Sequence, residues 1–190
     1  MATAIPNGQS GRVSNDARII VISGLPGVGK STTARLLALR LPRAAHVEAD
    51  NLQRLVLTGG VWPDAAGIHG EAERQLRLRL RNACLLARSF REYGFSAIVD
   101  DIVAGSRFDQ LVEELDGVPF DFVMLLPAFE HVQARWRAMG SPFVDAWGWI
   151  DDEIRLNTPR VGLWLDTTSL TADETVEVIL DRLDEATVSA

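Results

Sequence analysis

The chain has 190 residues, enough for one domain of ordinary size, and its 47% hydrophobic and 24% charged residues are typical of a globular protein. A net charge of -7 argues against a general nucleic-acid-binding protein, because the chain as a whole repels phosphate backbones. The single cysteine, Cys84, excludes an internal disulfide and no apolar run is long enough to span a membrane, so we expect a cytoplasmic protein without a membrane partner.

Residues 1–17 are rich in turn formers and lack the apolar stretch of a secretory signal, so we expect a flexible tail followed by a single domain over residues 18–190. Within that domain, short apolar runs alternate with helical patterns, which is typical of a parallel sheet flanked by helices. The predicted strands cover residues 18–23, 44–49, 95–101, 120–126 and 161–166. The predicted helices cover residues 30–41, 50–57, 71–93, 107–115, a segment through Met139, 150–156 and a last helix that opens with a capping box at Thr171 and Glu174.

A glycine-rich loop joins the first predicted strand to the first predicted helix. Gly24 to Ser31 match the pattern G-x-x-x-x-G-K-[ST], in which backbone N–H groups and the start of a helix surround a phosphate chain. Lys30 would neutralise the β- and γ-phosphates, and the Ser31 hydroxyl would reach Mg²⁺. The sequence therefore predicts binding of a nucleoside triphosphate, either ATP or GTP, through the residues Gly24, Leu25, Pro26, Gly27, Val28, Gly29, Lys30, Ser31 and Thr32.

Two classes of protein use such a loop: kinases, and ATP- or GTP-hydrolysing switches or motors. The chain contains no Asn-Lys-x-Asp tetrapeptide for reading guanine, and its third predicted strand ends in "IVDD" without the glutamate that motors use to orient water. These features and the small size favour a kinase. A hydrolysing switch or a regulatory ATP-binding protein is the alternative.

Three aspartates follow predicted strands, at the edge of the sheet where the phosphate loop also lies. Asp50 follows the second strand and is either the general base for an acceptor hydroxyl or the cap of the next helix. Asp100 and Asp101 end the third strand, and their side chains should point in opposite directions because they are neighbours in extended backbone. We expect Asp100 to hold Mg²⁺ through water, and Asp101 to face the acceptor or to cap the next turn.

Two further residues are candidates for binding the acceptor. Arg54 lies one helical turn after Asp50 and could orient that carboxylate or hold the acceptor. Trp62, in the loop that follows, could line the acceptor pocket or serve only in packing.

The stretches "SGLPGVGKS", "EADNL", "AIVDDIVAG" and "GLWLDTT" together resemble the chloramphenicol phosphotransferase-like family of small P-loop kinases, from about residue 18 onward. The resemblance implies transfer of phosphate from ATP, with Mg²⁺, to a hydroxyl of a small molecule, and it implies that Asp50 is the base. Because the family looks related to shikimate and gluconate kinases, it also implies an α/β three-layer sandwich with a five-stranded parallel sheet in the order 2-3-1-4-5 and a small helical lid.

The family carries arginines in the helix and lid after the fourth strand. Here Arg135 is the candidate that would neutralise charge on the transferring group, while Met139 stands where a second arginine would be expected. Arg160 could supply the missing charge or contact the nucleotide base. Residues 140–157 would close over the site and exclude water. The resemblance leaves the acceptor open between antibiotic and metabolite, and a homo-oligomer is suggested only by the general frequency of symmetric assemblies.

Overall fold

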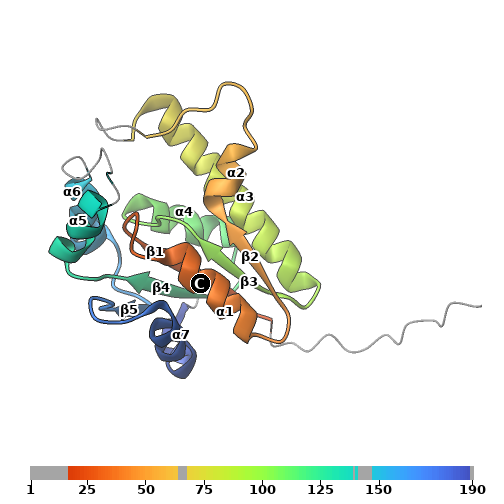
Figure 1. Cartoon of the computed structure of the whole chain (residues 1–190). Helices are drawn as coiled ribbons and strands as arrows, with labels where there is room; N and C mark the ends of the chain where they lie inside the picture. The colour runs from red at the N-terminus through yellow and green to blue at the C-terminus, as the bar shows by residue number, and fades with distance from the viewer. Residues whose placement is uncertain (1–16, 64–67, 139, 141–146, 189–190) are drawn as a thin grey trace, which may run out of the picture.

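The computed structural model describes residues 17–63, 68–138, 140 and 147–188, so nearly all of the predicted tail lies outside the described residues. Its centre is a parallel sheet with the strand order β2-β3-β1-β4-β5, which confirms the predicted order (Figure 1). The parallel strands are β1 Ile19–Gly24, β2 Ala44–Glu48, β3 Ser96–Asp100, β4 Phe120–Leu125 and β5 Leu163–Leu165.

The central strands are mostly apolar and buried along their whole length because helices cover both faces of the sheet. Every residue of β1 and of β4 is buried. Figure 1 shows α1 (Lys30–Arg40) in front of the sheet, where it packs against α7 (Ala172–Asp181), and α3 (Gly70–Glu92) and α4 (Ser106–Leu115) behind it. The structure therefore has the predicted three layers.

The remaining helices are short and lie near the carboxyl ends of the strands. They are α2 Ala49–Arg54, α5 Phe129–Ala138, α6 Gly148–Asp152, and the π-helical turn η1 Glu153–Asn157 that continues α6. The predicted capping box of α7 is present, with the Thr171 side chain accepting from the Glu174 amide. Met139, which the sequence placed in a helix, and residues 141–146 of the predicted lid lie outside the described residues.

One strand was not predicted. β6 (Thr187–Val188) pairs antiparallel with β4, so the sheet has six strands instead of five. It lies beside a cluster in which the Arg18 guanidinium contacts the Asp121 carboxylate at 2.7 Å and the Thr187 hydroxyl donates to the same carboxylate. Two residues are too few to show a strand period.

The strand register brings the ends of β1, β2 and β3 to one edge of the sheet. Ile22 of β1 pairs with Asp100 of β3, and Asp100 pairs with Glu48 of β2. The loop after β1, the start of α2 and the loop after β3 therefore meet there. Within the described ranges, no helix is both long and apolar enough to cross a membrane.

Candidate active site

The loop between β1 and α1 has the curled backbone that its glycines predicted. Gly24 has φ 146°, and a Cβ atom there would lie 2.5 Å from the carbonyl oxygen of Leu125. Gly29 has φ 101° and precedes α1, whose first turn has no side-chain cap. A Cβ atom at Gly29 would meet nothing within 4 Å, so the helix start is open to an anion. Leu25 and Val28 bury their side chains in the core, and the Val28 amide donates to the Leu25 carbonyl at 3.4 Å within the loop.

Lys30 is the first residue of α1 and bends back over this loop. Its Nζ atom donates to the carbonyl oxygen of Leu25 at 3.0 Å. Burial lowers the pKa of the Lys30 ammonium below its ordinary value, and the carboxylates of Asp100, Asp101 and Asp50 act in the opposite direction. A triphosphate would supply the anionic partner that this ammonium group lacks at the loop.

The residues predicted to hold Mg²⁺ line one cavity beside the phosphate loop. Ser31 and Asp100 both line it, and the Asp100 carboxylate is 3.2 Å from Nε2 of His46. No group of three or more His, Cys, Asp or Glu side chains suited to a metal occurs among the described residues. Mg²⁺ does not need one, because it commonly takes one or two protein oxygens together with phosphate oxygens and water. A hydroxyl and a carboxylate beside a phosphate loop fit this ion.

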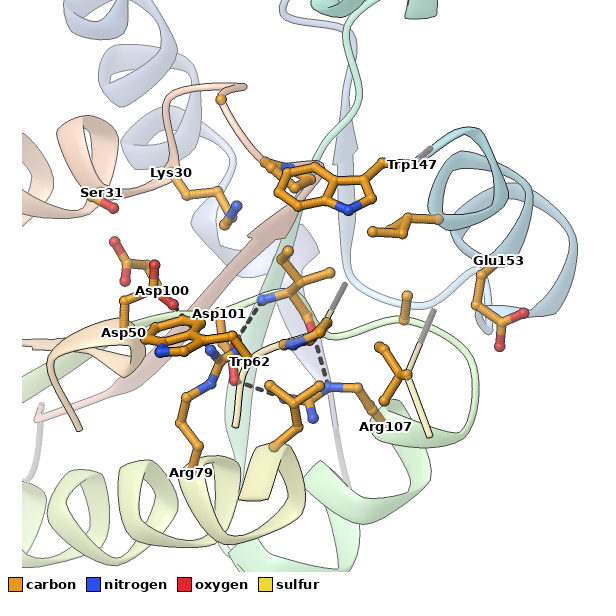
Figure 2. A pocket seen from close by; sticks show the side chains of 18 of the residues that line it. Lys30, Ser31, Asp50, Trp62, Arg79, Asp100, Asp101, Arg107, Trp147 and Glu153 are labelled. Carbon is orange, nitrogen blue, oxygen red and sulfur yellow. Dashed lines mark hydrogen bonds and ion pairs between the residues drawn. The ribbon is translucent and has the colours of Figure 1, made fainter. Parts of the chain in front are cut away.

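A buried ion-pair network connects Asp50 to the interior (Figure 2). Nη1 of Arg79 contacts Oδ1 of Asp50 at 3.0 Å, and Nη2 of Arg79 contacts Oδ1 of Asp101. Nη2 of Arg107 contacts Oδ2 of Asp101 at 2.8 Å. The Asp101 side chain is only 1% exposed, whereas the Asp50 side chain is 52% exposed. Asp50 is thus held on one oxygen and open on the other.

Asp50 occupies a different local position from the one the sequence suggested. β2 ends at Glu48, and Asp50 is the second residue of α2 instead of a strand end or a helix cap. Its orientation comes from Arg79 of α3 and not from Arg54. Arg54 donates to the Asn51 side chain at 2.8 Å and is absent from the residues that line either described cavity. The structure does not bring Arg54 to Asp50.

A cavity of about 940 Å³ lies over these groups and contains Lys30, Ser31, Asp50, Asp100 and Asp101 in its lining. The predicted acceptor residue Trp62 also lines it, and Trp147, Trp149 and Ile150 border it from the described part of the lid. Figure 2 shows Lys30 and Asp50 directed toward the same space, whereas the Asp101 carboxylate points toward Arg79 and Arg107. The structure therefore brings together the phosphate loop, the candidate base and the candidate acceptor pocket.

A second cavity, of about 230 Å³, lies on the other side of the phosphate loop. It shares Gly29 and Thr32 with the large cavity and is lined further by Thr167, Thr171 and Arg135. Arg135 therefore does not line the cavity that contains Asp50, where a residue that neutralises charge on the transferring phosphoryl group would be expected. Arg160 lines neither described cavity, and its guanidinium lies 4.0 Å from the ring centroid of Trp164.

The sequence reasoning missed the two arginines that organise the site. Arg79 lies in the arginine-rich stretch "RQLRLRLR" of a long helix, yet it is only 6% exposed. Its position between Leu76 and Ala83, both on the buried stripe of α3, was the signal that could have found it. Arg107, in the first turn of α4, had no local signal because its partner Asp101 belongs to another element.

No protein-family model matches the sequence, and no curated protein matches it. Solved structures do match. The tunicamycin resistance protein of Deinococcus radiodurans superposes with a TM-score of 0.67 at 25% identity, over 92% of this chain and 99% of that chain. A gluconokinase from Sinorhizobium meliloti 1021 gives 0.61 at 19% identity, over 88% and 94%. An APS kinase of Mycobacterium tuberculosis gives 0.58 at 18% identity, over 88% and 97%. The chain therefore has the α/β fold of the P-loop kinases.

Proposed function

We propose that this protein is an ATP-dependent phosphotransferase that moves the γ-phosphoryl group to a hydroxyl of a small molecule. The observation that carries the proposal is that Lys30 of the phosphate loop and the half-exposed Asp50 line one cavity. A phosphate donor and a group that can take the acceptor's proton are the two requirements of phosphoryl transfer to an alcohol.

The positions of these side chains support the following reaction. The acceptor hydroxyl donates its proton to the Asp50 oxygen that Arg79 does not engage, and its oxygen forms a bond to the γ-phosphorus. The bond between the γ-phosphorus and the bridging oxygen breaks, and ADP leaves with that electron pair. Lys30 neutralises charge that develops on the phosphoryl oxygens.

Ser31 and, through water, Asp100 would hold the Mg²⁺ ion, which neutralises phosphate charge when it is bound. His46 at 3.2 Å from the Asp100 carboxylate would fix the orientation of that carboxylate. Asp101 cannot share this task, because both of its oxygens are engaged by arginines.

The smaller cavity suits the nucleoside of ATP. It begins at Gly29 and Thr32, on the side of the loop away from Asp50, and Arg135 lines it. A guanidinium can stack on a flat base, so we propose a nucleoside contact for Arg135 in addition to the phosphate role that the sequence suggested. The large cavity then remains for the acceptor and the γ-phosphate.

The resemblance to chloramphenicol phosphotransferases, and the similarity to a protein named for tunicamycin resistance, support an antibiotic as one class of acceptor. The gluconokinase and APS kinase likenesses support a metabolite as the other. Chloramphenicol, tunicamycin and a panel of hydroxyl metabolites are therefore the compounds to test first for ATP-dependent ADP release.

The test compares Asp50→Asn with the unchanged protein. The variant should bind MgATP with unchanged affinity in calorimetry and lose about 10²- to 10⁴-fold in turnover with any active acceptor, the usual contribution of a general base. Asp116→Asn, at an exposed helix end away from both cavities, is the matched control. Unchanged turnover in Asp50→Asn would remove this residue from the mechanism, and absence of nucleotide binding to the unchanged protein would refute the proposal as a whole.

A further inference from the structure

The large cavity is bordered by aromatic side chains on more than one side. Trp62 comes from the loop after α2, and Trp147 and Trp149 come from the segment around α6. In Figure 2 the rings of Trp62 and Trp147 border the same space from different directions. Ile68, Leu76, Ile102 and Ile150 complete an apolar lining. Such walls suit a ligand with a flat apolar face.

The loop that carries Trp62 is held in place, although 46% of the Trp62 surface is exposed. The buried Gln75 of α3 accepts from the Val61 amide at 2.8 Å and donates to the Gly59 carbonyl at 2.7 Å. Gln53 of α2 donates to the same Gln75 oxygen at 3.0 Å. A loop that is already fixed costs less entropy when the side chain that it carries binds a ligand.

The two buried arginines that line the cavity are already paired with carboxylates of the protein. Arg79 contacts Asp50 and Asp101, and Arg107 contacts Asp101 while its Nε atom donates to the Ile102 carbonyl. Lys30, which forms no ion pair among the described residues, belongs to the phosphate loop and would face the phosphates of ATP. Outside that loop, Arg77, which is exposed and lies one turn from Glu73 on the same helix, is the lining cation that forms no ion pair among the described residues.

Carboxylates outnumber cations in the lining. It contains Asp50, Glu73, Asp100, Asp101 and Glu153 against Lys30, Arg77, Arg79 and Arg107. Within the described residues, Glu73 and Glu153 form no ion pair, and the Glu153 carboxylate accepts from the Asn157 side-chain amide.

We propose that the acceptor is an uncharged or cationic hydroxyl compound with a flat apolar face, such as an aromatic ring or a sugar ring, and that the cavity discriminates against anionic acceptors. The inference rests on the proposed function and narrows it. An anion in this cavity would meet unpaired carboxylates and would find both buried arginines already paired with carboxylates, so much of its desolvation would go uncompensated. A cation would meet aromatic faces and free carboxylates.

Three probes that share one scaffold and differ in charge test the proposal: phenyl β-glucoside and its 4-aminomethyl and 4-carboxy derivatives. Binding is measured in the presence of MgADP by saturation-transfer NMR and by titration of the phenyl proton signals, so no turnover is required. The neutral and aminomethyl probes should bind, and the carboxy probe should bind at least about tenfold more weakly, because like charges brought together are costly. Glu153→Gln should reduce the difference in affinity between the neutral and carboxy probes without weakening binding of the neutral probe.

Variants of the aromatic wall supply the second arm. Trp62→Ala should weaken binding of the neutral probe by roughly three- to tenfold, the range for an aromatic contact. Gln75→Met keeps the Trp62 ring but removes the hydrogen bonds that hold its loop. It should weaken binding of the neutral probe less than Trp62→Ala does. Trp164→Ala, on β5 and outside both cavities, is the control and should leave binding unchanged.

The possible results separate this inference from the proposed function. Tightest binding by the carboxy probe, or no binding by any probe, would overturn the inference even if MgATP binds normally. If Trp62→Ala binds the neutral probe as tightly as the unchanged protein does, the proposal that the aromatic side chains contact the acceptor is wrong. Failure of MgATP to bind in calorimetry would instead count against the phosphotransferase itself.

Discussion

Replacing Asp101 by asparagine should destabilise the fold without removing any atom that touches the acceptor. The Asp101 carboxylate accepts from Arg79, from Arg107 at 2.8 Å and from the Ile102 amide at 2.7 Å. An asparagine keeps the shape but carries no charge, and its NH₂ group would face a guanidinium that also only donates. Two buried cations would therefore share a weaker acceptor.

The size of the effect follows from which arginine loses more. Arg79 keeps Asp50 as a partner, but Arg107 has no other carboxylate within ion-pair distance among the described residues. Burial lowers the pKa of Arg107, which shows that its charge is costly here, and the Asp101 carboxylate opposes that cost. Breaking one buried pair costs about 3–5 kcal/mol, and the retained Asp50 contact favours the low end. At roughly 2–4 °C for each kcal/mol in a domain of this size, about 3 kcal/mol predicts a fall in Tm of about 6–12 °C.

Thermal unfolding followed by circular dichroism or calorimetry measures this change. Glu177→Gln is the matched control, because it breaks the Arg40–Glu177 pair at 2.6 Å, whose side chains are 47% and 54% exposed. Exposed pairs contribute about 0–1 kcal/mol, so the control should shift Tm by no more than about 4 °C. If Asp101→Asn shifts Tm no more than the control and instead raises only the KM of an acceptor, Asp101 is a substrate contact and the network argument is wrong.

Three further predictions follow from single residues. Gly24→Ala should abolish MgATP binding in calorimetry, because its Cβ would lie 2.5 Å from the Leu125 oxygen; an unchanged Kd would contradict the loop geometry. Burial raises the pKa of the Cys84 thiol from 9.0 to about 12, so this thiol should resist maleimide in the native protein and react only on unfolding. The free energy of unfolding should fall as pH rises above 9, because only the unfolded thiol then loses its proton. Rapid labelling of the native protein would argue against this burial. Lys30 is the only lysine in the chain, so mass spectrometry can assign lysine modification by an amine-directed reagent to this residue. The reagent should modify Lys30, and MgATP should protect it. Because its pKa is lowered, Lys30 should react at a lower pH than a free lysine, and modification that MgATP leaves unchanged would place the phosphates elsewhere.

The phosphate loop and the existence of the parallel strands could be predicted because their determinants are local. The motif from Gly24 to Ser31 combines positions that need positive φ with a helix start, and both requirements are readable from neighbouring residues. The parallel strands are buried on both faces and so appear as continuous apolar runs. The family resemblance then supplied the order that the runs alone leave open.

The partners of Asp50 could not be predicted because they are set by packing between distant segments. Asp50 and Arg79 are separated by α2, a loop and half of α3, and the choice of Arg79 over the nearer Arg54 depends on which arginine lies on the buried face of α3. The same holds for β6, whose two residues pair with β4 beside a cluster that joins Arg18 and Asp121. Local spacing carries no information about such contacts.

Three aspartates at one edge of the sheet illustrate how environment divides chemical roles among identical side chains. Asp101 is almost fully buried and accepts from two arginines and the Ile102 amide, so its carboxylate is not accessible to a substrate. Asp100 lies in the cavity beside Ser31 with His46 on one oxygen, an arrangement that suits a metal-bound water. Asp50 is half exposed and engaged on Oδ1 alone, which leaves Oδ2 for a proton. Because Arg79 joins Asp50 to Asp101, a change in the buried pair should also alter the orientation of the candidate base. We therefore expect the buried Asp101 and the candidate base Asp50 to be coupled through the guanidinium of Arg79.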